Sequence, residues 1–70
     1  MDRISVDSSN LASVGYELET NTLEIEFKKS GIYQYFNVPE QVYNELMTAG
    51  SHGQYFSYQI KPHYSYQKVG

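Results

Sequence analysis

The 70-residue sequence contains no cysteine, which excludes disulfides, thiolate metal sites and cysteine nucleophiles. It also lacks any apolar run near the roughly 20 residues that cross a bilayer, and its first residues lack the basic-then-apolar order of a secretory signal. A chain of this length buries only about 60% of its unfolded surface, so its core is small. We therefore expect one cytoplasmic domain over residues 1–70, with no membrane contact.

Acidic side chains are missing from the last third of the chain, because all eight Asp and Glu residues lie at or before Glu45. Residues 1–45 carry eight acids and three bases, whereas residues 46–70 carry two lysines and no acid. The charges of the two segments are therefore about −5 and +2, which sum to the net charge of −3. This net charge disfavours nucleic-acid binding by the whole surface but leaves a basic C-terminal patch free to bind a polyanion.

Alternating apolar residues predict an antiparallel sheet of three or four strands that meanders through residues 11–38. Ile4 and Val6 indicate a short strand before it. Near the C-terminus, Tyr64 and Tyr66 alternate with polar residues, which fits either an edge strand or an extended arm. With the helices described below, the pattern predicts an α+β fold.

The first hairpin is predicted to have a two-residue turn at Thr20-Asn21. This register places six residues opposite each other on one apolar face, pairing Leu18 with Leu23, Tyr16 with Ile25, and Val14 with Phe27. The opposite face then gathers four glutamates, with Glu17 directly across from Glu24. We expect that face to be open to water or screened by a cation.

The second hairpin is predicted to have the three-residue loop Lys29-Ser30-Gly31, with the glycine at positive φ. This register pairs Phe27 with Tyr33 and Ile25 with Tyr35 on the apolar face. A two-residue loop would instead turn Gln34 and Phe36 inward. We favour the first register.

Two helices are predicted to cover the apolar face of the sheet. Pro39 is expected at the first position of one helix and Gly50 at its C-terminal cap. Ser51 begins a capping-box pattern, and Phe56 and Ile60 follow it at helical spacing. The second helix is therefore expected to pack these two apolar residues against the sheet.

No group of residues supports a catalytic or metal site. The two histidines are eleven positions apart without a carboxylate nearby, and no acid follows Glu45 to complete a triad with Ser51 and His52. Gly50, Ser51 and Gly53 are better explained by turn and cap geometry than by an anion site. We therefore expect a protein that is not an enzyme and that binds neither a metal ion nor a cofactor.

The eight tyrosines are the remaining signal. We interpret four of them as core residues that supply large buried rings: Tyr16, Tyr33, Tyr35 and Tyr43. Both interpretations, core or surface, stay open for the three whose neighbours are polar or basic, Tyr58, Tyr64 and Tyr66. If exposed, these rings can stack on unpaired bases while phosphates are neutralised by Lys61, His63 and Lys68.

A series of short motifs runs along the chain from about Ser8 to Tyr66. It comprises Ser8-Ser9, Val14-Gly15-Tyr16, Thr22 to Phe27, Gly31-x-Tyr33-x-Tyr35, Val38-Pro39, Tyr43, Ala49-x-Ser51-x-Gly53-x-Tyr55-Phe56 and Ile60. This order resembles the KTSC domain family, which is named after its occurrence at the C-terminus of some lysyl-tRNA synthetases. The resemblance implies a central motif at Tyr33 and Tyr35 and a second motif at Ser51, Gly53, Tyr55 and Phe56.

The resemblance also favours RNA binding, because of the synthetase context. The leading hypothesis is a non-catalytic binding module that engages RNA in a translation-related setting through residues 51–68. The alternative is a protein-interaction or structural module whose exposed tyrosines form an interface. The sequence leaves the identity of the partner and the oligomeric state open.

Overall fold

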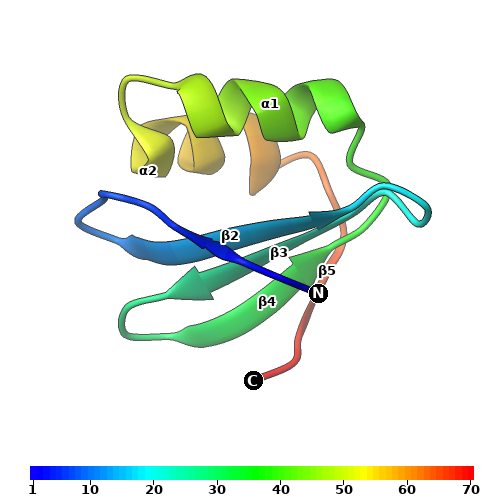
Figure 1. Cartoon of the computed structure of the whole chain (residues 1–70), viewed down its shortest axis with the longest axis horizontal. Helices are drawn as coiled ribbons and strands as arrows, with labels where there is room; N and C mark the ends of the chain where they lie inside the picture. The colour runs from blue at the N-terminus through cyan, green and yellow to red at the C-terminus, as the bar shows by residue number, and fades with distance from the viewer.

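The computed structural model describes residues 1–70 as a five-stranded antiparallel sheet with helices on one face (Figure 1). The strands lie in chain order in the sheet: β1 (Ile4–Ser5), β2 (Leu11–Glu17), β3 (Thr22–Phe27), β4 (Gly31–Tyr35) and β5 (Tyr66–Lys68). The helices are α1 (Glu40–Thr48), α2 (His52–Tyr55) and a π-helical turn, η1 (Phe56–Ile60), which continues directly from α2. The predicted α+β class and antiparallel meander are confirmed.

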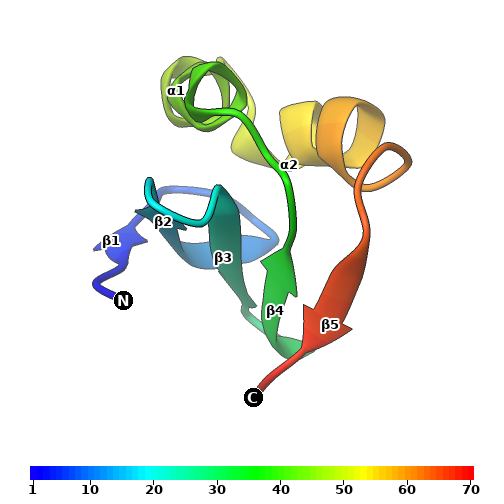
Figure 2. The same ribbon diagram turned by 90° about the vertical axis from the view of Figure 1, so that its right-hand side faces the viewer.

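The two edge strands explain why the sheet has five strands and not the three or four predicted. β1 has two residues and pairs Ile4 with Val14, and β5 has three residues and pairs Tyr66 with Tyr35. Both are shorter than the 4–8 residues over which alternation identifies a strand firmly, so the sequence indicated only a short strand at Ile4 and left the C-terminal segment open between a strand and an arm. Figure 2 shows the two strands at opposite edges of the sheet. The C-terminal segment is thus an edge strand and not a free arm.

The predicted register of the first hairpin is wrong by two residues. Tyr16 pairs with Leu23, and a four-residue loop runs from Leu18 to Asn21. A two-residue turn would put Thr20 at positive φ, which a β-branched residue resists, whereas here Asn21 takes the positive φ of 53°. Leu18 is therefore 58% exposed in the loop and does not lie on the apolar face.

The predicted register of the second hairpin is also wrong by two residues. Phe27 pairs with Gly31, so the three-residue loop spans residues 28–30. Gly31 has the predicted positive φ, at 100°, but it begins β4, where a side chain would lie 2.4 Å from the carbonyl oxygen of Gly70. A slip of two residues preserves the faces of a strand. Tyr33 and the buried Tyr35 therefore point towards the helices, as predicted.

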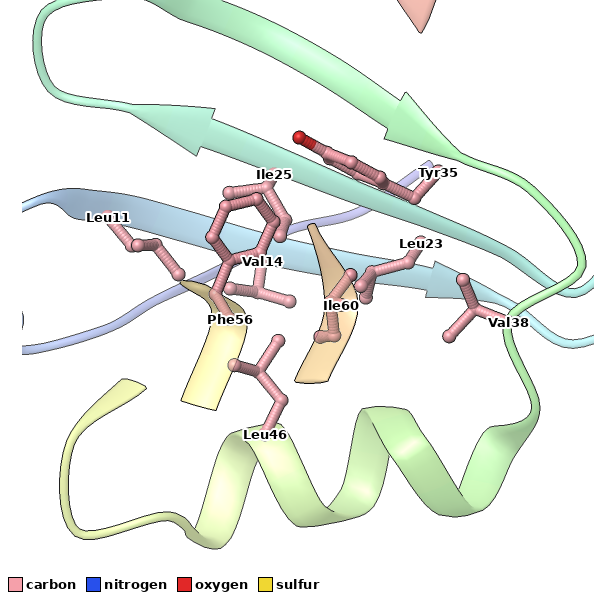
Figure 3. Packing of buried hydrophobic residues seen from close by; sticks show 9 residues of the cluster. All are labelled: Leu11, Val14, Leu23, Ile25, Tyr35, Val38, Leu46, Phe56 and Ile60. Atoms are coloured by element: carbon pink, nitrogen blue, oxygen red, sulfur yellow. The ribbon is translucent and has the colours of Figure 1, made fainter. Parts of the chain in front are cut away.

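The hydrophobic core lies between the sheet and the helices (Figure 3). Its buried members are Leu11, Val14, Leu23, Ile25, Tyr35, Val38, Leu46, Phe56 and Ile60. Two tyrosines predicted to be core pack at its margin, where the rings of Tyr16 and Tyr43 stack with centroids 5.0 Å apart. The hydroxyl of Tyr16 donates to the carbonyl oxygen of Val38 at 2.5 Å, which fixes the connection between β4 and α1.

The helix boundaries differ by one residue from those predicted. Pro39 is the N-cap of α1 and Ala49, in an extended conformation, is its C-cap, so the helix ends before Gly50. Ser51 caps α2 as predicted, because its side chain accepts a hydrogen bond from the backbone N–H of Gln54 at 3.2 Å. The cap fixes the start of the segment that carries η1.

The glutamate-bearing face of the sheet is less open than predicted. Glu24 is only 7% exposed and lies across from Gln34 and Gly15, not from Glu17. Its carboxylate contacts the guanidinium group of Arg3 and accepts a hydrogen bond from the Gln34 amide at 2.8 Å. The guanidinium group of Arg3 is therefore the cation that screens the glutamates of this face.

Gly15 allows the N-terminal segment to cross this face of β2. A Cβ atom on Gly15 would lie 2.6 Å from the carbonyl oxygen of Asp2 and 3.0 Å from the side chain of Arg3. The Nε atom of Arg3 donates to the hydroxyl of Ser13 at 2.9 Å, which holds the guanidinium group beside Glu24. The position of Arg3 thus depends on the absence of a side chain at Gly15.

The ion pair also determines the ionisation of Glu24. Burial by itself raises the pKa of this carboxyl, but the hydrogen bonds from Gln34 and Arg3 and the charge of Arg3 together lower it. A carboxyl whose pKa is lowered by folding stabilises the fold above its unfolded pKa of about 4.3. That stabilisation is lost as the pH falls through the lower, folded-state pKa.

The substitution Arg3→Ala is expected to lower the free energy of unfolding by about 1–3 kcal/mol near neutral pH, because it leaves a buried carboxylate without its counterion. The loss should shrink as the pH falls below the unfolded pKa of about 4.3 and through the lower folded-state pKa, because a protonated Glu24 needs no counterion. Urea denaturation across this pH range measures both effects. Lys29→Ala, which removes an exposed loop charge, should change stability by less than about 0.5 kcal/mol. A loss that stays constant with pH would contradict this role of the ion pair.

The substitution Gly31→Ala is expected to cost about 1–3 kcal/mol, since it forces a side chain into a positive φ and against Gly70. Gly50→Ala is the matched control, because a Cβ atom there meets nothing within 4 Å. Thermal unfolding should show a lower midpoint for Gly31→Ala and no loss for Gly50→Ala. Equal midpoints for the two variants would refute the explanation of the β3–β4 turn.

Candidate functional site

Five aromatic rings line a groove of about 320 Å³ between the sheet and η1. The rings belong to Phe27, Tyr33, Tyr35, Phe56 and Tyr66. The remaining lining residues are Asn10, Ser30, Ser57 and Lys61, so the groove contains one cationic side chain and no carboxylate. We call this site the aromatic groove. Figure 2 shows how the segment that follows α2 lies above β4 and β5.

Strand pairing places the tyrosines of the aromatic groove side by side. Tyr66 pairs with Tyr35, and its ring centroid lies 5.5 Å from that of Tyr35 and 5.8 Å from that of Tyr33. Phe56 meets Tyr35 and Phe27 edge to face, with centroids 5.3 and 5.2 Å apart. Tyr66 nevertheless remains 60% exposed. Its ring is therefore held by two others while much of its surface faces solvent.

The π-helical turn η1 supplies the other wall. Phe56 and Ile60 point into the core, whereas Ser57 and Lys61 line the groove. The N–H of Lys61 donates to the carbonyl oxygen of Phe56 at 2.9 Å, which closes the wide turn. Such turns occur frequently at functional sites.

Tyr35 is the most buried tyrosine in the aromatic groove. Burial, followed by the neighbouring Tyr66 and Tyr33, raises the pKa of its hydroxyl to about 12. The hydroxyl is therefore neutral at physiological pH. It adds no negative charge to the groove.

One lysine lines the aromatic groove, and the other three lie on segments that adjoin its lining residues. Lys61 lines it, and the Cε atom of Lys68 lies 3.1 Å from the point where a Gly31 side chain would begin. Lys28 and Lys29 precede Ser30, a lining residue, in the exposed β3–β4 loop. We call these four side chains the lysine rim. Because Lys28 and Lys29 lie in the acidic part of the sequence, the charge pattern along the chain does not identify them as part of this site.

The residues predicted to contact RNA or a partner do not all meet at this groove. Tyr66 and Lys61 line it, and Lys68 lies at its edge. Tyr64 is half-buried and packs against the core, and His63 is exposed in the turn after η1. Alternation and charge could indicate exposure of these residues but not their arrangement.

Tyr58 lies in a second, polar hollow. It is 70% exposed and shares this hollow with Ser51 and Gly53 of the second predicted motif and with the anionic Asp7. Asn10 and Ser57 line both this hollow and the aromatic groove, so the two depressions are contiguous.

Two residues near the polar hollow have structural partners. The Nδ1 atom of His52 donates a hydrogen bond of 2.8 Å to the carbonyl oxygen of Leu46. The hydroxyl of Tyr55 donates to Glu45 at 2.7 Å; burial and this bond raise the pKa of Tyr55 to about 12. Both bonds tie α2 to α1. Of the second motif, Phe56 therefore reaches the aromatic groove, while Ser51 and Tyr55 fix the helix that carries it.

The structure contains no group of three or more His, Cys, Asp or Glu side chains that could hold a metal ion. None of its helices is long and apolar enough to span a membrane.

The chain is similar to a protein of the same length and to a segment of a larger enzyme. An uncharacterised protein of Stutzerimonas stutzeri is 40% identical over 70 residues, and the match covers 99% of each sequence. A segment of a lysine–tRNA ligase from Nostoc sp. is 41% identical over 63 residues, which are 90% of this chain but 11% of the ligase. The domain thus corresponds to a small part of that enzyme.

One solved structure and one family model identify the family. The crystal structure of a KTSC domain protein from Yersinia pestis superposes with a TM-score of 0.97 at 39% sequence identity, covering 99% of this chain and 97% of that one. The family model described as the KTSC domain matches residues 7–64. Neither description assigns a catalytic activity. The chain belongs to the KTSC domain family.

Proposed function

We propose that this KTSC domain is a non-catalytic module that binds single-stranded RNA, in a translation-related setting, through the aromatic groove and the lysine rim. The observation that carries the proposal is the composition of the groove, which combines five aromatic rings with a lysine and no carboxylate. Proteins that bind single strands use this combination of stacking rings and positive charge.

The accessible ring of Tyr66 supports a stacking contact. A base that stacks on an aromatic side chain contributes about 1–3 kcal/mol, and the contact tolerates any base. Paired bases in a duplex are stacked on each other and cannot offer a free face. The groove therefore favours unpaired RNA.

The distribution of charge supports binding of a polyanion at this site. Lys61 lines the groove and Lys68 lies at its edge. The loop that contains Lys28 and Lys29 leads into the lining residue Ser30. The acids Glu24 and Glu26, by contrast, lie on the other face of the sheet beside Arg3. Local positive charge can attract phosphates even when the net charge is −3. Tyr58 and His63 are then candidate contacts for a strand that continues beyond the groove.

The relationship to lysine–tRNA ligases supports RNA as the partner. A protein whose name specifies tRNA contains a segment 41% identical to this chain. Exposed Tyr58 and Tyr66 favour the second candidate, a protein interface, because aromatic residues are enriched there. The lysine rim favours RNA, since lysine is depleted from protein interfaces.

Fluorescence anisotropy with a labelled single-stranded RNA should show binding that weakens with salt. A log–log slope of about −2 is expected if two to three phosphates are neutralised. Lys61→Ala and Lys68→Ala should each weaken binding and make the slope shallower by roughly 0.7.

Asn44→Asp is the control, because it lowers the net charge by the same amount as Lys61→Ala at an exposed position on α1. It should leave the salt slope unchanged. Equal effects of Asn44→Asp and Lys61→Ala would mean that overall charge, and not the lysine rim, determines binding. Absence of RNA binding, with an apparent mass that rises with protein concentration, would support the protein-interface alternative.

A further inference from the structure

We infer that the aromatic groove is a pocket for one unpaired nucleotide, whose base stacks on Tyr66 and whose phosphate meets Lys61. The inference rests on the proposed function and narrows it, because it assigns a single nucleotide to this site.

Of the five lining rings, only that of Tyr66 is exposed and can accept a base. Tyr33 is half-buried between Phe27 and Tyr66. Tyr66 is 60% exposed, whereas Tyr35 and Phe56 are each 4% exposed. Phe27 is half-buried and meets Tyr33 and Phe56 edge to face, with centroids 5.6 and 5.2 Å apart. These packed rings leave no space between them for a second base. The groove thus has a single stacking surface.

The stacking surface is fixed before a ligand arrives. Pairing of β5 with β4 sets the backbone of Tyr66, and contacts with Tyr33 and Tyr35 set its ring. Binding therefore requires little loss of side-chain freedom, which otherwise costs about 0.5–1.5 kcal/mol for each immobilised side chain. A single nucleotide can then bind without the support of a longer strand.

Polar groups lie beside the stacking surface. The backbone of Asn10 is held on both sides, since its N–H donates to the hydroxyl of Ser8 at 3.2 Å and its carbonyl oxygen accepts from the N–H of Lys28 at 3.0 Å. Its side-chain amide, which lines the groove, offers both donors and an acceptor to the edge of a base. The hydroxyl of Ser57 adds a second such group.

The size of the groove limits its occupant. Its volume of about 320 Å³ lies at the lower end of the range of about 300–1,000 Å³ for small-molecule pockets. A neighbouring nucleotide would have to pass Asn10 and Ser57 into the polar hollow. One nucleotide therefore fills the aromatic groove.

The test is a titration of the isotopically labelled full chain with AMP, followed by amide chemical shifts. AMP has a purine ring to cover Tyr66 and a phosphate for Lys61. Shifts are expected at Asn10, Ser57 and Tyr66, with weaker binding of adenosine and of ribose 5-phosphate. Tyr66→Ala should weaken AMP binding by about 5-fold or more through loss of stacking, whereas Tyr66→Phe should retain it.

A single-stranded RNA titrated in parallel separates this inference from the proposed function. If the RNA shifts the groove residues but AMP at several times the concentration does not, the single-nucleotide pocket is wrong and RNA binding stands. If AMP binds but Tyr66→Ala leaves its affinity unchanged, the stacking assignment is wrong. If neither ligand binds, both proposals are wrong.

Discussion

The pairing of β5 with β4 is the contact on which the proposed binding surface depends. It places the ring of Tyr66 against those of Tyr33 and Tyr35, and each such aromatic pair contributes about 0.5–1.5 kcal/mol beyond the burial of its surface. β5 has only three residues, but backbone hydrogen bonds continue on both sides of it, from the N–H of Phe36 to the carbonyl oxygen of Ser65 at 2.9 Å and from the N–H of Val69 to that of Ile32 at 2.8 Å. The strand orders the rings, and the rings in turn hold the strand. Without this pairing, one wall of the aromatic groove would be missing.

Acidic and basic side chains are distributed differently in the folded structure than along the sequence. The sequence divides into an acidic part and a mildly basic end, but the fold returns the β3–β4 loop to the C-terminal lysines. Lys28 and Lys29 thereby join the lysine rim. The remaining base, Arg3, neutralises the buried Glu24 on the other face. A polyanion can thus approach one side of a protein whose net charge is negative.

Sequence patterns predicted the faces of the strands but not their registers. Tyr33 and Tyr35 face the core as predicted because a two-residue slip preserves alternation. The first slip arose because Asn21 takes the positive φ at the end of a four-residue loop, and the second because Gly31, with its predicted positive φ, begins β4 and does not end the loop. The short strand at Ile4 was indicated, whereas the C-terminal segment stayed open between an edge strand and an extended arm. Five of the nine lining residues were predicted as members of the central or second motif or as contact residues, but Asn10 and Phe27 reach the groove only through tertiary packing and could not be assigned to it from the sequence.

The most direct test of RNA binding by the aromatic groove is measurement of intermolecular nuclear Overhauser effects between the protein and a short single-stranded RNA. We expect contacts between ring protons of Tyr66 and base protons of the RNA, and between the side chain of Lys61 and the sugar protons that flank the nearest phosphate. Contacts confined to the outer surface of α1, or to the face that holds Glu24 and Arg3, would contradict RNA binding by this groove.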